Sequence, residues 1–161
     1  MTLDRRTLLT GTAVFGVAAA FGFWPAQADI NRNGTYKLSD AEWRKKLPGQ
    51  SYDVLRHAAT ERPFTSPLLE EHRKGTFVCL GCDQKLYDSA TKYDSHTGWP
   101  SFWQPLPKAI GTSKDDELGY DRTEVHCARC LGHLGHVFDD GPKPTGLRYC
   151  MNGVAMKFVP A

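Results

Sequence analysis

Four of the five cysteines stand in two C-x-x-C pairs, a spacing that suits metal ligation. The pairs are Cys79 with Cys82 and Cys127 with Cys130, and each follows a segment predicted to be a strand. A tight turn at a strand end can aim two sulfurs at one point, so two such turns supply the tetrahedral four-thiolate shell that suits zinc. Because 44 residues separate the pairs, a shared ion would join distant parts of a sheet as a structural staple.

Two other interpretations of these pairs compete with a structural zinc site. A C-x-x-C pair can be a redox-active dithiol as in thioredoxin, but that motif belongs at the start of a helix rather than after a strand. In an oxidising compartment the cysteines could instead form two disulfides. We favour zinc because two matched pairs are a more specific signal than a single pair.

Cys150 is the fifth cysteine, and its neighbours along the chain are suited to activating a thiol. Arg148 lies two residues earlier on the same face of a predicted strand, where its charge would favour the thiolate. Asn152 lies two residues later and can donate hydrogen bonds to a thiolate or to a bound oxygen. Free cysteine is also among the most buried residue types, so a core cysteine is the alternative.

Two histidines, His133 and His136, add imidazoles that titrate near neutral pH and are suited to proton delivery. With the neighbouring carboxylates Asp139 and Asp140, the same pair could instead hold a second metal ion. Spacing alone leaves three alternatives open: a nucleophile with its acid, a structural thiol, and a second metal site.

The chain that must position these groups is predicted to be mainly β. Short strand-forming runs separated by Gly, Pro, Asp and Asn predict six strands, at residues 76–78, 85–87, 123–126, 136–138, 147–150 and 156–159. Helices are predicted only before them: one opened by a Ser39–Glu42 capping box and ended by Pro48-Gly49, one at 52–59, and one from Pro67 to Gly75. We therefore expect an antiparallel β domain with short helices at its N-terminal end.

Residues 1–28 have the pattern of an export signal. Arg5 and Arg6 precede a run to Ala28 that contains no charged residue and ends in an A-x-A cleavage pattern. The adjacent arginines resemble a bacterial twin-arginine signal, whereas the alternative is a retained membrane anchor, since about 20 apolar residues can span a bilayer. We expect cleavage after Ala28, a linker at 29–38, one domain at 39–161, and a periplasmic protein that meets the membrane only during export.

Composition excludes several classes of protein. The chain has 161 residues and a formal charge of +2, so it is too short for two comfortable domains and too weakly charged for bulk polyanion binding. A nucleic-acid-binding zinc ribbon fits poorly with this charge and with an export signal. An odd number of cysteines excludes a fully paired disulfide framework. We expect a monomer that does not bind nucleic acid.

Seven segments together resemble the methionine-R-sulfoxide reductase (MsrB) family, and the resemblance runs from about Asp40 to Pro160. They are 61–66 (ERPFTS), 78–82 (VCLGC), 97–102 (TGWPSF), 122–125 (RTEV), 127–130 (CARC), 133–142 (HLGHVFDDGP) and 145–152 (TGLRYCMN). The resemblance implies two small antiparallel sheets with a structural zinc site opposite the active face. It also implies reduction of the R epimer of methionine sulfoxide, free or in proteins, with a thioredoxin-like or small-thiol reductant.

The resemblance assigns roles to individual residues. Cys150 would be the nucleophile that becomes a sulfenic acid, while His133 and His136 would bind and protonate the sulfoxide oxygen or polarise a water that does so. The substrate would contact Trp99, which packs on its S-methyl group, and Phe102. The residues that tune the thiolate and the histidines would be Arg148, Asp140 and Asn152.

One position departs from the family. Many members carry a recycling cysteine where this chain has Thr97, and the preceding residue is His96 where glycine is common. With the other four cysteines assigned to zinc, Cys150 has no evident disulfide partner, so we predict a one-cysteine cycle completed by an external reductant. The alternative class, a non-enzymatic zinc-binding interaction module, leaves Cys150, Trp99 and the two histidines without a shared purpose.

Overall fold

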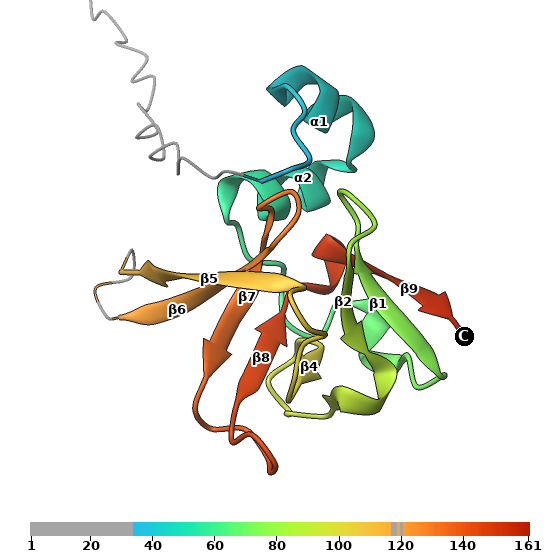
Figure 1. The fold of residues 1–161 in the computed structure, drawn as a ribbon, viewed down its shortest axis with the longest axis vertical. Helices are drawn as coiled ribbons and strands as arrows, with labels where there is room; N and C mark the ends of the chain where they lie inside the picture. The colour runs from blue at the N-terminus through green and yellow to red at the C-terminus, as the bar shows by residue number, and fades with distance from the viewer. Residues whose placement is uncertain (1–33, 117–118, 120) are drawn as a thin grey trace, which may run out of the picture.

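The computed structural model describes residues 34–116, 119 and 121–161, which form two antiparallel sheets with two short helices packed at one end (Figure 1). The helical elements are α1 Asp40–Lys46, α2 Gly49–His57, and the 3-10 turns η1 Pro67–Glu70, η2 Ser89–Thr91 and η3 Gly153–Ala155. The strands are β1 Gly75–Cys79, β2 Lys85–Asp88, β3 Lys92–Tyr93, β4 Ser101–Phe102, β5 Ile110–Asp115, β6 Arg122–Cys127, β7 His133–Phe138, β8 Arg148–Met151 and β9 Met156–Pro160. The predicted fold class is confirmed.

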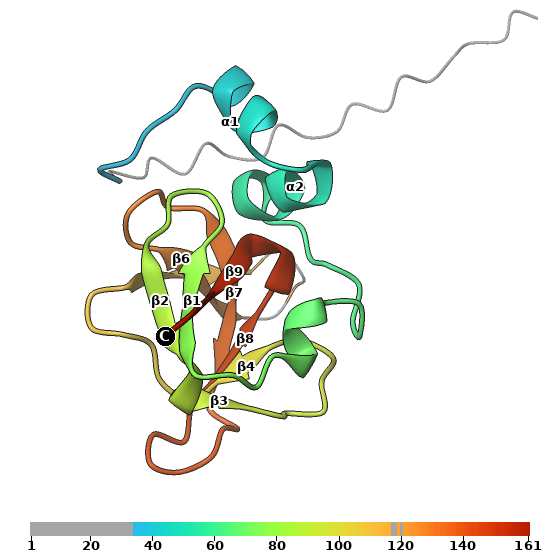
Figure 2. The same ribbon diagram turned by 90° about the vertical axis from the view of Figure 1, so that its right-hand side faces the viewer.

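The smaller sheet has the strand order β2-β1-β9, and the larger has the order β3-β4-β8-β7-β6-β5. Every pairing between neighbouring strands is antiparallel. The C-terminal strand β9 pairs with β1, while β8, only a few residues earlier, belongs to the larger sheet (Figures 1 and 2). The turn η3 between them therefore carries the chain from one sheet to the other.

The core lies where the two sheets meet and is rich in aromatic rings. Tyr87 of β2 stacks on Phe102 of β4 with ring centroids 4.2 Å apart, and Phe77 of β1 meets Phe102 edge to face at 4.9 Å. All three side chains are fully buried. Such aromatic pairs add to the free energy gained by burial alone, so they hold β4, which has only two residues, in place.

The helices follow the sequence prediction in number and depart from it in extent. The capping box of α1 is present, with Ser39 accepting from the Glu42 backbone and Glu42 accepting from the Ser39 backbone at 2.7 Å. The second helix starts at Gly49, earlier than predicted, because the chain enters it directly from Pro48. The third is only the 3-10 turn Pro67–Glu70, so its predicted extension to Gly75 was wrong. The residues after Glu70 are polar and offer no apolar face to bury.

Three strands were not predicted from the sequence. Two of them, β3 and β4, have two residues each, too few to show a period. The third, β5, is the outermost strand of the larger sheet, and five of its six residues, from Gly111 to Asp115, are small or polar. An edge strand with polar side chains lacks the apolar alternation by which strands are recognised.

The segment before α1 is docked on the domain in its described part. Tyr36 donates its backbone N–H to the carbonyl oxygen of Arg129 at 3.1 Å, and the Arg129 guanidinium lies over the Tyr36 ring. At Gly34 a Cβ atom would lie 2.8 Å from the same carbonyl, so only glycine permits this approach. Residues 34–38 are thus not a free linker. The predicted signal, residues 1–28, lies outside the described residues, and no described helix is both long and apolar enough to cross a bilayer.

Candidate active site and four-cysteine cluster

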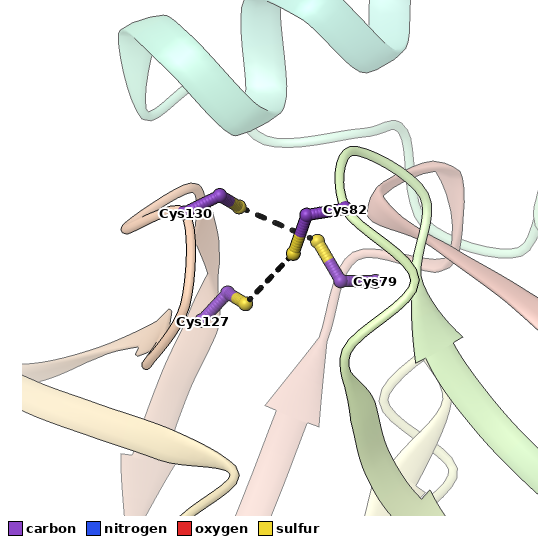
Figure 3. Close-up of side chains that lie close together, drawn as sticks. All are labelled: Cys79, Cys82, Cys127 and Cys130. Carbon is purple, nitrogen blue, oxygen red and sulfur yellow. Dashed lines mark hydrogen bonds between the residues drawn. The ribbon is translucent and has the colours of Figure 1, made fainter. Parts of the chain in front are cut away.

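The two C-x-x-C pairs meet in one buried cluster (Figure 3). The sulfur atoms lie within 4.8 Å of one another, with Cys79 to Cys130 and Cys82 to Cys127 each 3.6 Å apart. A disulfide would require about 2.05 Å. Tetrahedral zinc with Zn–S bonds of about 2.3 Å places sulfurs about 3.8 Å apart. The cluster therefore has the spacing of a four-thiolate metal site rather than of two disulfides.

The two turns that carry the cysteines have the same backbone geometry. Each follows a strand, β1 or β6, as predicted. The N–H of the first cysteine donates to the carbonyl five residues on, and the N–H four residues on donates back to the first cysteine's carbonyl. The residue after the second cysteine has a left-handed backbone in both turns, with φ of 61° at Asp83 and 58° at Leu131. This repeated turn directs each pair of sulfurs to a common point.

The N-terminal helices cover the cluster (Figures 1 and 3). The Trp43 ring of α1 lies against Gly81, between the first pair of cysteines, and Leu55 of α2 lies against Gly132. From α2, Arg56 donates to the carbonyl of Cys130 at 3.2 Å. The cluster is thus sealed from solvent by the elements predicted to be helical, and all four cysteines are buried.

Cys150 lies in a different part of the larger sheet, in the middle of a row of side chains. In the register of the sheet it faces Ser101 of β4 on one side and His136 of β7 on the other. Residues directly opposite each other share one face of a sheet, so the thiol and the imidazole lie side by side. Cys150 is partly exposed, in contrast to the other four cysteines, so the alternative of a fully buried core cysteine is wrong.

Each histidine is hydrogen-bonded to a carboxylate that was not predicted from the sequence. His133 Nδ1 lies 2.9 Å from Glu124 Oε1, and His136 Nε2 lies 2.6 Å from Asp115 Oδ2. Asp115 also accepts from Arg122 at 2.7 Å. Burial lowers the pKa of His136, and its hydrogen bond to Asp115 partly opposes that shift by favouring the imidazolium. The two carboxylates fix the orientation of the two rings, whose centroids are 5.3 Å apart.

Comparison with known proteins agrees with this arrangement. A family model described as the SelR domain matches residues 47–160. The chain belongs to the SelR domain family. Its match includes both C-x-x-C turns, both histidines and Cys150.

Three curated relatives of this SelR domain carry the name peptide methionine sulfoxide reductase MsrB. The protein from Agrobacterium fabrum is 51% identical over 76% of this chain and 91% of its own length. Those from Leptospira interrogans and Bradyrhizobium diazoefficiens are 50% and 52% identical over 74% and 76% of this chain, and 92% and 88% of their own lengths. Among solved structures, the Mis18 yippee-like domain overlaps with a TM-score of 0.45 at 16% identity, over 55% of this chain and 98% of that one.

Arg148 and Asp140 form one unit in the SelR domain. The guanidinium donates to both carboxylate oxygens of Asp140, through Nε and Nη2, at 2.8 Å each. These hydrogen bonds hold the pKa of Asp140 below its usual value. Asp140 therefore acts on Arg148 rather than on the histidines, whose carboxylate partners are on β5 and β6. Within the described residues, the four cysteines are the one group placed to hold a metal, so the alternative of a second metal site at the histidines gains no support.

Asn152 has a positioning role that the sequence reading did not predict. Its side-chain oxygen accepts from the backbone of Glu61 at 2.9 Å, and its amide nitrogen donates to the Leu134 carbonyl at 3.1 Å. Glu61 is itself buried and accepts hydrogen bonds from the backbones of Gly153 and Val154, while burial raises its pKa. This network anchors the end of β8 behind Cys150.

The two predicted substrate contacts differ in exposure. Trp99 is partly exposed, and its indole N–H donates to the carbonyl of Glu61 at 3.1 Å, which fixes the plane of the ring. Phe102 is fully buried among core aromatic rings, so its side chain supports β4 from within and does not face a substrate. Phe102 was predicted to contact the substrate only because it stands in the TGWPSF segment. Glu61 stands in another segment of the resemblance, ERPFTS, but its pairing across 91 residues to Asn152 was not readable from sequence.

Proposed function

We propose that this protein reduces the R epimer of methionine sulfoxide to methionine and so repairs oxidised proteins. The observation that carries the proposal is the partly exposed Cys150 directly opposite His136, in a chain that belongs to the SelR domain family. The names of relatives about 50% identical support the reaction class. Free methionine sulfoxide is a second substrate to be tested beside oxidised proteins.

The chemistry assigns one task to each group around the thiol. The Cys150 thiolate attacks the sulfoxide sulfur while the sulfoxide oxygen takes up a proton. The S–O bond breaks and the oxygen passes to the Cys150 sulfur, while the transient bond between the two sulfurs breaks with its electron pair on methionine. Cys150 is left as a sulfenic acid. The sulfoxide sulfur is reduced by two electrons and Cys150 is oxidised by two.

The histidines supply the proton or position the water that carries it. His136 lies opposite Cys150 in the sheet, whereas His133 lies beside the His136 ring and is only 2% exposed. The Nε2 atom of His133 is buried and has no hydrogen-bond partner among the described residues. A substrate oxygen or a bound water would satisfy this atom. We assign both histidines to the sulfoxide oxygen: His136 as the imidazole opposite Cys150 in the sheet, and His133 through its open Nε2 atom.

Epimer choice rests on Trp99. Its ring is fixed by the hydrogen bond to Glu61 and is partly exposed, and the next residue, Pro100, accepts a backbone hydrogen bond from Met151, the residue after Cys150. An apolar indole wall favours the methyl group over the oxygen of the sulfoxide, so it allows one configuration at sulfur to reach Cys150 with the oxygen turned to the histidines. Trp99→Ala should therefore raise KM more than it lowers kcat.

The cycle closes with an external thiol. Thr97 stands at the position of the missing recycling cysteine, with its hydroxyl 3.7 Å from the Cys150 sulfur. One external thiol displaces the sulfenic oxygen as water and forms a mixed disulfide, which a second thiol resolves to regenerate Cys150. A thioredoxin-like protein or a small thiol would serve as this reductant.

The decisive experiment is an assay of the purified protein on separated R and S sulfoxides with dithiothreitol as reductant. We expect turnover of the R epimer and none of the S epimer. Turnover of S alone would overturn the proposal. After one turnover without reductant, mass spectrometry should find a trappable sulfenic acid on Cys150, and an internal disulfide would contradict the one-cysteine cycle.

We further propose that the four-cysteine cluster holds one structural zinc ion. The buried sulfurs match a tetrahedral shell, and zinc bound there would cross-link the β1–β2 turn to the β6–β7 turn. Metal analysis of the purified chain should find about one zinc per protein, which dithiothreitol does not remove.

The location of the protein is a separate proposal, supported by residues 1–28 alone. A charged start, an apolar run and a small-residue end favour export to the periplasm by a twin-arginine route. Fractionation of cells with the Arg5→Lys, Arg6→Lys double variant as control tests it. A wild-type protein that stays in the cytoplasm with an intact N-terminus would contradict it.

A further inference from the structure

Three hydroxyl groups form a hydrogen-bonded chain that ends on the sulfur of Cys150. Thr97 Oγ1 lies 3.7 Å from Cys150 Sγ and 2.8 Å from Ser95 Oγ. Ser95 Oγ in turn lies 2.7 Å from Ser101 Oγ, and Ser101 can donate to the backbone carbonyl of Trp99 at 3.2 Å. All three hydroxyls come from β4 and the loop before it.

The chain has two complete orientations, because each hydroxyl both donates and accepts. When Cys150 is a thiol, it donates to Thr97, Thr97 to Ser95, Ser95 to Ser101, and Ser101 to the Trp99 carbonyl. When Cys150 is a thiolate, the three hydroxyls rotate, and each donates toward the sulfur. No proton changes owner between the hydroxyls, yet a donor faces the sulfur only when the sulfur is charged.

The other groups around Cys150 do not duplicate this contact. From β7, His136 lies directly opposite, but its Nε2 atom is engaged by Asp115. On β8 itself, Arg148 makes two hydrogen bonds to Asp140. From β3, Tyr93 interacts electrostatically with the thiol and with the Arg148–Asp140 pair. Ser101 is the partner of Cys150 on β4 and is fully buried. Among the described residues, Thr97 is the side chain whose hydrogen bond to the sulfur the structure records.

We propose that the Thr97–Ser95–Ser101 hydroxyl chain is a positioning device that stabilises the Cys150 thiolate by a hydrogen bond that follows the charge on the sulfur. The proposal rests on Cys150 being the nucleophile of the proposed reaction. It gives Thr97 a task of its own at the position where many MsrB proteins carry a second cysteine. A hydrogen bond to a charged group is stronger than one between neutral groups, so the chain favours the reactive form of the thiol.

The test measures the thiol directly and does not depend on turnover. The rate at which iodoacetamide alkylates Cys150 is followed from pH 5 to 10 in the intact protein, by mass spectrometry of the peptide that contains Cys150. Thr97→Val keeps the shape of the side chain and removes the hydroxyl. We expect its alkylation rate at pH 7 to fall about fivefold and the whole profile to move to higher pH.

Three further variants separate this role from packing. Thr97→Ser keeps the hydroxyl, so its alkylation rate should stay within about twofold of wild type. If Thr97 acted only by packing, loss of its methyl group in Thr97→Ser would lower the rate as well. Thr91→Val is the matched control, since its hydroxyl donates to the Asp88 carbonyl away from Cys150. Ser95→Ala breaks the chain without touching the sulfur and should shift the profile in the same direction by about half as much on a logarithmic scale.

Two results would overturn the proposal: a Thr97→Val profile that superimposes on wild type, or a Ser95→Ala profile that does so while Thr97→Val is shifted. Either can occur while the wild-type protein still reduces methionine sulfoxide. Conversely, absence of reductase activity in the wild type would contradict the proposed function, but the alkylation rates could still be measured and compared. The two proposals therefore fail separately.

Discussion

Cysteine occupies two opposite environments in this protein. In the cluster, the four sulfurs stand at strand ends and in turns, are at most 5% exposed, and crowd within 4.8 Å of one another. Cys150 stands inside strand β8, is partly exposed, and is surrounded by an imidazole, a guanidinium–carboxylate pair and a hydroxyl. No residue named around Cys150 belongs to the four-cysteine cluster.

The difference between these two environments shows what makes a cysteine side chain suited to bind a metal or to act as a nucleophile. Four thiolates pushed together out of water repel one another, so they are stable only with a cation between them. A single thiol beside hydrogen-bond donors and water is free to be oxidised and reduced again. A metal in the cluster would also protect four thiols from the chemistry that Cys150 must undergo.

The sharpest test of this contrast is Cys150→Ser. Serine is isosteric, but its hydroxyl is a far weaker nucleophile, so we expect turnover to fall by more than about 1000-fold. Thermal unfolding and metal content should stay at wild-type values, because no cluster residue is altered. Loss of metal or of the unfolding transition in this variant would show that the two regions are not independent.

The reciprocal variant is Cys127→Ser. It removes one of four ligands, and metal binding in small zinc domains contributes about 10 kcal/mol or more to folding, so we expect the free energy of unfolding to fall by more than about 3 kcal/mol. Calorimetry and metal analysis measure this change. A protein that unfolds as wild type does and is active without metal would refute the structural role of the cluster.

Sequence reasoning found these two regions unequally. The grouping of the four cysteines was predicted because their spacing reveals it: two residues between the cysteines of each pair and a strand before each pair. The surroundings of Cys150 were predicted only in part. Arg148 was predicted beside it, but the Asn152 side chain bonds to Glu61 and Leu134 rather than to the sulfur. The Glu124 and Asp115 carboxylates that hold the histidines were not predicted. Those carboxylates reach the site through strand register, which short polar strands such as β5 do not reveal.

Asp115→Asn tests whether the missed carboxylates matter to the chemistry. Asp115 favours the imidazolium of His136, so its loss should lower the pKa of His136 further and leave less of the protonated acid at neutral pH. We expect kcat/KM at pH 7 to fall about tenfold, the size of one charge-assisted hydrogen bond. The falling limb of the pH profile should move to lower pH. The exposed Asp116→Asn is the control, and an unchanged profile in Asp115→Asn would remove His136 from the proton transfer.

Thr97→Cys should have the smallest effect on turnover and the most specific effect on the oxidised protein. The Thr97 hydroxyl lies 3.7 Å from the Cys150 sulfur, so a rotation of two side chains brings two sulfurs to the bonding distance of about 2.05 Å. With dithiothreitol in excess, we expect activity within about fivefold of wild type, because the variant loses the Thr97 hydroxyl but attack on the sulfoxide still belongs to Cys150. After one turnover without reductant, the sulfenic oxygen should leave as water and an internal disulfide should appear in place of the trappable sulfenic acid. Mass spectrometry distinguishes the two products. A persistent sulfenic acid in this variant would mean that a side chain at position 97 cannot reach the Cys150 sulfur. The lack of an internal disulfide would then follow from the shape of the loop and not from the threonine at this position.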